Sequence, residues 1–186
     1  MQPSASQGAF SLRSLRLTAA LILSVAAPAA AQEMPQVDCD RLHFRIVGEE
    51  YERTCRAMER QGDEGRWRQE HIVAEGMTGV YAVSRAIPVS GHGYMLPVSP
   101  RSAAERAGLR DIEDWGEQMR IEGYRAHGFT ARPPEGRDRL RCLAFVRNPA
   151  PTGGAQIQIV GVYCTLPGAA MDEAAAAQVL ERIEAN

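Results

Sequence analysis

The segment Leu140–Cys164 reads LRCLAFVRNPAPTGGAQIQIVGVYC. It contains two apolar runs rich in β-branched residues, separated by a connection of Pro, Gly and polar residues. This pattern predicts an antiparallel β-hairpin with arms at residues 140–147 and 157–164. If the hairpin is centred on Gly153, Cys142 and Cys164 face each other directly, at a separation that a disulfide accepts. A slip of one residue would place the two sulfur atoms on opposite faces of the hairpin.

The chain has four cysteines, at Cys39, Cys55, Cys142 and Cys164. In an exported protein, an even number of cysteines predicts structural disulfides, and four cysteines allow three connectivities. The hairpin register favours a Cys142–Cys164 bond, which leaves Cys39–Cys55 as the second pair. Metal binding and reactive thiols are the alternatives. No CxxC motif is present, so the spacing typical of redox and zinc sites is absent.

The N-terminus has the three parts of a secretory signal peptide. Arg13 and Arg16 precede an apolar run at residues 17–27, and small residues end at Ala31. We therefore expect cleavage after residue 31, which leaves residues 32–186 as one exported domain, periplasmic or secreted. An uncleaved anchor is the alternative. No later segment is long and apolar enough to span a membrane. The net charge of −2 gives no reason to expect nucleic-acid binding.

The rest of the chain predicts both strands and helices. Residues 66–76 and 78–89 contain β-favouring residues with glycines near their ends, which is typical of strands. Residues 48–62 predict a helix, because Tyr51, Cys55 and Met58 repeat at i, i+4 and i+7. Residues 111–125 predict another helix, with Ile112 and Trp115 on its buried side.

Two further helices complete the prediction. Ser102 begins a short helix, and Asp172 and Glu173 lie in the first turn of a C-terminal helix. Both arms of the hairpin are apolar on both faces, as in strands that are covered on two sides. We therefore expect an α+β domain, stapled by two disulfides, in which an antiparallel sheet packs against helices.

No residue pattern predicts catalysis, a metal or a cofactor. His92 lies between two glycines, where an imidazole is accessible as a general base. However, no Ser-His-Asp spacing accompanies it. His43 and His71 form a metal site only if the fold brings them together. The acidic pairs, such as Glu113-Asp114, are typical of solvated surfaces.

A series of arginines provides the candidate binding residues. Arg132 precedes Arg137, Arg139 and Arg141, and the last three alternate, so that in a strand they share one face. A row of guanidinium groups suits the carboxylate or phosphate groups of a partner. The alternative is a solvated strand end that pairs with local acids such as Glu135.

These observations predict a binding or interaction protein of the cell envelope rather than an enzyme. Its partner would be an envelope protein or an anionic ligand. Two alternatives belong to other functional classes. One is a small periplasmic hydrolase that uses His92, and the other is a structural component of the envelope.

The C-terminal sequence GVYCTLPGAAMDEAAAAQVLERI, residues 161–183, is similar to the ends of small exported proteobacterial proteins. In those proteins an aromatic-x-Cys strand leads through Pro-Gly to a terminal amphipathic helix. The resemblance covers about the last quarter of the chain. It implies export and this strand–helix ending, and it implies no activity and no site residues.

Overall fold

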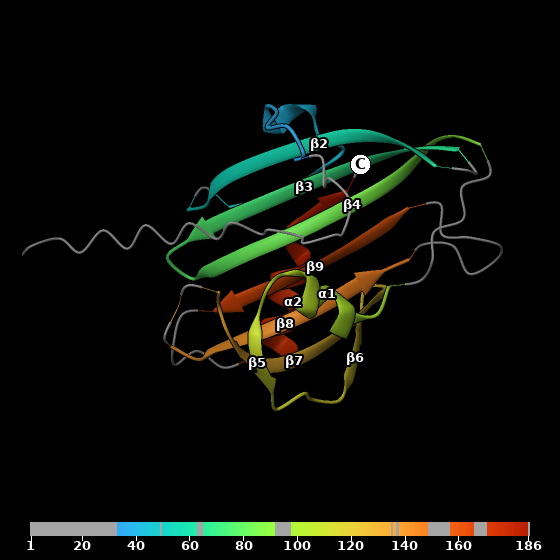
Figure 1. Ribbon diagram of the computed structural model, residues 1–186. Coiled ribbons are helices and arrows are strands. Elements are labelled where there is room, and N and C mark those ends of the chain that lie inside the picture. The colour runs from blue at the N-terminus through green and yellow to red at the C-terminus, as the bar shows by residue number, and fades with distance from the viewer. Residues whose placement is uncertain are drawn as a thin grey trace, which may run out of the picture.

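The computed structural model describes residues 33–48, 50–62, 65–91, 98–134, 136, 138–148, 157–165 and 171–185. Over these residues, antiparallel strands form one large sheet in the order β2-β3-β4-β9-β8-β7-β5, and β6 also pairs with β7 (Figure 1). A small second sheet pairs β1 with β10. The elements are η1 (Cys39–Arg41), β1 (Phe44–Ile46), β2 (Glu52–Gly62), β3 (Gly65–Gly76), β4 (Gly79–Gly91), α1 (Pro100–Arg106), β5 (Arg110–Glu113), β6 (Gln118–Ile121), β7 (Tyr124–Arg132), β8 (Leu140–Arg147), β9 (Gln158–Thr165), α2 (Glu173–Glu181) and β10 (Ile183–Ala185).

The expected α+β class is wrong, because the protein is a β-rich domain. Among the described residues, strands make up 58% and helical segments 15%, and there are two short α-helices. Two segments that were expected to be helical are extended instead. The sheet therefore supplies most of the packing surface, and each helix covers only a part of it.

The first of these segments, residues 48–62, contains strand β2. Its spacing of apolar residues fits a helix, but Tyr51, Cys55 and Ala57 are the buried residues, which is an alternation of odd positions. β2 pairs with β3 along its whole length, from Glu52↔Glu75 to Gly62↔Gly65. This long ladder overrides the helix preference of the Glu, Arg and Met residues in the segment.

The second segment, residues 111–125, contains β5, β6 and the start of β7. Asp111, Asp114 and Glu122 have φ angles of 50°, 50° and 48°, a left-handed conformation that an α-helix excludes. Glu122 and Gly123 form the two-residue connection between β6 and β7, where Ile121 pairs with Tyr124. Two successive residues with positive φ are typical of such tight hairpins.

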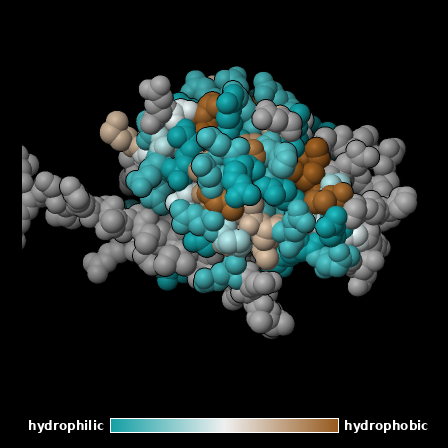
Figure 2. Space-filling model, turned by 90° about the horizontal axis from the view of Figure 1, so that it is seen from above, coloured by the Kyte–Doolittle hydropathy of each residue, from teal (hydrophilic) through white to brown (hydrophobic). Residues whose placement is uncertain are grey.

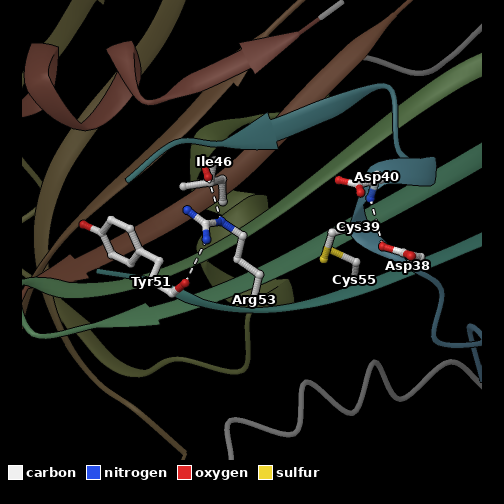
Figure 3. Close-up of a disulfide and its surroundings, with 7 residues drawn as sticks. All are labelled: Asp38, Cys39, Asp40, Ile46, Tyr51, Arg53 and Cys55. Carbon is white, nitrogen blue, oxygen red and sulfur yellow. Dashed lines mark hydrogen bonds between the residues drawn. A yellow bond between two sulfur atoms is a disulfide. The ribbon is translucent and has the colours of Figure 1, made fainter. Parts of the chain in front are cut away.

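The hairpin of β8 and β9 confirms the predicted register. Cys142 faces Cys164, and a disulfide joins them with a Cα–Cα distance of 4.1 Å. A second disulfide joins Cys39 to Cys55 with a Cα–Cα distance of 5.2 Å and ties η1 to β2 (Figure 3). Close to it, Arg53 donates hydrogen bonds to the carbonyl oxygens of Ile46 and Tyr51. Two disulfides are typical of extracellular and periplasmic proteins.

The two faces of the large sheet are covered by different elements (Figure 1). On one, called the α2 face, α2 and the β1–β10 sheet bury Phe44, Phe145 and Leu180 in the larger core. On the other, called the α1 face, α1 covers a smaller core around the Cys142–Cys164 disulfide. The expected C-terminal helix is present as α2, but Asp172 is its N-cap, through the amide of Ala175, rather than a residue of its first turn. The helix α1 is capped by Ser99 rather than Ser102.

The face of the molecule that Figure 2 shows is mostly hydrophilic over the described residues. Seen from above the view of Figure 1, apolar residues form small separate patches among hydrophilic ones (Figure 2). Among the described residues, Met77 and Val89 are the large apolar side chains that are most exposed. A polar cleft is therefore a better candidate for a binding site on these residues than an apolar patch.

Candidate functional site

A cleft of about 460 Å³ opens beside the start of α2, in the range of volumes of small-molecule sites. It lies where the β5–β6 connection, β6, β7 and β8 meet the residue that precedes α2. Its lining combines one arginine, two carboxylates and two methionines: Arg141, Asp114, Glu117, Met119 and Met171, together with Gly116, Gly128, Phe129 and Thr130.

Arg141 reaches the cleft because of its position in β8. Leu143 and Phe145 on the same strand belong to the core beneath α2, so the alternation of side chains places Arg141 on the α2 face as well. Its guanidinium is exposed. Among the described residues, this guanidinium has no carboxylate within ion-pair distance and no hydrogen-bond acceptor.

The other arginines of the series have different surroundings. Arg139 forms an ion pair with Glu113, and its hydrogen bond lowers the pKa of Glu113. Arg132 lies 3.5 Å from a carboxylate oxygen of Asp111. Arg137 lies outside the described residues. The structure therefore separates Arg141 from neighbours that already have local acidic partners.

Two contacts of the Gly116 main chain, one from its amide and one to its carbonyl oxygen, fix the position of the loop that carries Asp114 and Glu117. The amide of Gly116 donates to the carbonyl oxygen of Gly128 at 2.8 Å. Nδ1 of His127 lies 3.0 Å from the carbonyl oxygen of Gly116. A Cβ at Gly116 would lie 3.3 Å from that same Gly128 oxygen, so glycine allows this close approach.

Side-chain contacts complete the support of this loop. Oγ1 of Thr130 donates to Oδ2 of Asp114 at 2.9 Å. On the α1 face, the Trp115 ring lies 5.2 Å from the His127 ring and 5.0 Å from the Phe129 ring, measured between centroids. Arg101 of α1 lies over the same indole at 5.5 Å. The cleft is therefore held in shape by the surrounding fold before any ligand arrives.

A second polar cluster on the α2 face surrounds Glu70. This fully buried carboxylate accepts hydrogen bonds from the main-chain amide of His43 at 3.0 Å and from Nε of Arg68 at 2.7 Å, and it lies 2.6 Å from Nδ1 of His43. Arg85 donates to the carbonyl oxygen of His43. These contacts fasten the chain before β1 to strands β3 and β4.

The histidines singled out in the sequence are not brought together. His43 contacts Glu70 on the α2 face, whereas His71, the next residue along β3, lies on the opposite face beside Ser84. Burial, with a contribution from Arg56, lowers the pKa of His71 to about 4. His92 lies outside the described residues. Within the described ranges, no group of three or more His, Cys, Asp or Glu residues is placed to hold a metal ion.

Of the residues that line the cleft, the sequence singles out Arg141 as a candidate binding residue, and this role stays a prediction. The sequence pattern places Asp114, Glu117 and Met119 in a helix, which would separate them around its axis. The glycines at positions 116 and 123 were the signal against that helix.

In the described part of the chain, no helix is both long and apolar enough to cross a membrane. Comparisons of this chain with protein-family models, with curated proteins and with solved structures found no match.

Proposed function

We propose that this protein is an exported binding protein of the cell envelope, periplasmic or secreted, whose cleft beside α2 binds a small ligand through an anionic group. The observation that carries the proposal is the position of Arg141. Arg141 is an exposed residue that lines the cleft, and it has no ion-pair partner among the described residues. The two disulfides support the exported location.

The chemistry of arginine makes a carboxylate or phosphate the natural ligand. The planar guanidinium donates two parallel hydrogen bonds to such groups, which adds both energy and orientation. Arg139 already donates a hydrogen bond to the carboxylate of Glu113 and forms an ion pair with it, so its charge is partly neutralised within the protein. Arg141 lies in β8 itself and lines the cleft, and its guanidinium has no ion-pair partner among the described residues.

The test compares two arginines that are two residues apart. Binding of N-acetyl-L-methionine, a carboxylate with an apolar side chain, is measured by isothermal titration calorimetry. We expect Arg141→Gln to weaken binding by about ten-fold or more, because the charge-assisted hydrogen bonds are lost. The matched control Arg139→Gln should leave binding within about two-fold of the unmodified protein.

Two results would contradict the proposal. One is binding that survives Arg141→Gln with unchanged affinity. The other is the absence of binding by every small carboxylate and by inorganic phosphate. Circular dichroism of each variant shows whether the sheet is intact.

A further inference from the structure

We infer that the ligand of this cleft is a zwitterion, a short peptide or amino acid that carries both a carboxylate and an ammonium group. The inference rests on the proposed function, because it starts from a ligand anion at Arg141. It goes further in using the carboxylates of the cleft, Asp114 and Glu117.

The charges of the cleft argue against a simple anion. One guanidinium and two carboxylates line the same space, so an anion drawn to Arg141 also meets the negative potential of Asp114 and Glu117. A simple cation meets the opposite difficulty at Arg141. A ligand with both charges satisfies the two sides at once, and charge complementarity of this kind gives specificity.

Thr130 places the two kinds of charge close together. It lies opposite Arg141 on the neighbouring strand, and its hydroxyl donates to the carboxylate of Asp114. Directly opposed residues have Cβ atoms about 4.5–5.5 Å apart, so Asp114 and Arg141 approach the cleft from two sides of Thr130. They are not an ion pair, since no contact within 4 Å joins them among the described residues.

Asp114 keeps acceptor capacity for an ammonium group. In the described part of the chain it accepts one hydrogen bond, from Thr130, whereas a carboxylate has about four acceptor positions. Its φ of 50° is a left-handed conformation that aspartate adopts more readily than most other residues. The main-chain bonds of Gly116 fix this loop in advance, which lowers the entropy lost on binding.

The remaining lining suits an apolar side chain. Met119 and Met171 contribute flexible, polarisable surface that adapts to different shapes. Gly128 has no side chain, and a Cβ at this position would lie 3.5 Å from the carbonyl oxygen of Met171, so glycine leaves room for Met171 beside β7. These features favour a peptide with an apolar residue next to the carboxylate that binds Arg141.

Three forms of one dipeptide separate the contributions of the charges. Calorimetry compares glycyl-L-leucine with N-acetylglycyl-L-leucine, which lacks the ammonium group, and with glycyl-L-leucinamide, which lacks the carboxylate. We expect the zwitterion to bind about ten-fold more tightly than either blocked form. In the double variant Asp114→Asn, Glu117→Gln, the free and acetylated peptides should bind alike. The control Glu105→Gln, an exposed acid on α1, should leave the difference intact.

The outcomes distinguish this inference from the proposed function. If the acetylated peptide binds as tightly as the free one and Arg141→Gln weakens both, the zwitterion is excluded and the anion site stands. If the amide binds best and Arg141→Gln has no effect, both are wrong. Asparagine retains an acceptor for Thr130, and circular dichroism of the double variant checks that the fold survives.

Discussion

At the scale of single residues, Glu70 is an ionisable group that is held by hydrogen bonds from Arg68 and from the main chain of His43. Its carboxylate is fully buried, and burial alone would raise its pKa. Hydrogen bonds from Arg68 and His43 outweigh that effect, so that the pKa of Glu70 is lowered from its ordinary value of 4.5. The charged form is therefore the one that the fold stabilises, and it holds the chain before β1 against the sheet.

We predict that Glu70→Gln destabilises the protein by about 2–4 kcal/mol, because Arg68 and His43 lose a buried anionic partner. The lowered pKa of Glu70 also fixes the sign of a pH effect. Ionised Glu70 stabilises the folded state fully at a pH above 4.5, the pKa of this group in the unfolded chain. The stabilisation is lost as the pH falls through the lower pKa that Glu70 has in the folded protein. Urea unfolding of both proteins between pH 3 and pH 7 measures this. Equal stabilities at pH 7 would show that the network contributes nothing.

The lowered pKa of His71 predicts a second dependence of stability on pH, at a higher pH than that of Glu70. Burial and Arg56 lower the pKa of His71 from 6.5 to about 4, so the folded protein binds fewer protons there than the unfolded chain. Stability should therefore fall as the pH decreases from 6.5 towards 4. His71→Gln should flatten this part of the curve. An NMR titration in which the His71 resonance has a midpoint near 6.5 would contradict the account.

At the scale of elements, the β8–β9 hairpin is the part of the fold that the sequence predicts best. Two apolar runs, a Pro/Gly connection and a cysteine in each arm determine both the strands and the register. The C-terminal helix was predicted for similar local reasons, since Asp172 caps it and Ala176, Val179 and Leu180 are its buried residues.

The predictions of helices at residues 48–62 and 111–125 are wrong because the spacing of the apolar residues in these segments fits a strand as well as a helix. Tyr51 and Cys55 lie on one side of a helix, and they also lie on one side of a strand. Pairing with β3 decides between the two, and that pairing is a long-range contact that a local pattern does not contain. The cleft was missed for the same reason, because it joins a loop, three strands and the start of a helix.

We predict that replacing Cys142 and Cys164 together by alanine lowers the free energy of unfolding by about 2–4 kcal/mol. The bond closes a loop with a sequence separation of 22 residues and lies in the core beneath α1. Urea unfolding monitored by tryptophan fluorescence measures the change. The double variant should still show the far-ultraviolet spectrum of a β-protein. An unchanged unfolding midpoint would show that this disulfide does not stabilise the folded protein.

At the scale of the whole molecule, the sheet separates two polar sites on its α2 face. The Glu70 cluster lies on β3 and β4, and the Arg141 cleft lies on β7 and β8, with β9 between the two pairs of strands. In the Glu70 cluster the charges satisfy one another. In the cleft, the guanidinium has no protein partner among the described residues. Because of this difference we propose the cleft, rather than the Glu70 cluster, as the binding site.

The most direct test of this account is to locate the bound ligand by NMR. Glycyl-L-leucine is titrated into the ¹⁵N-labelled protein, and the shifts of the backbone amides are mapped onto the fold. The account predicts that the largest shifts occur at Gly116, Gly128, Thr130 and Arg141, and that they disappear in Arg141→Gln. Shifts confined to the residues around His43 and Glu70, or no shifts up to the solubility limit of the dipeptide, would contradict it.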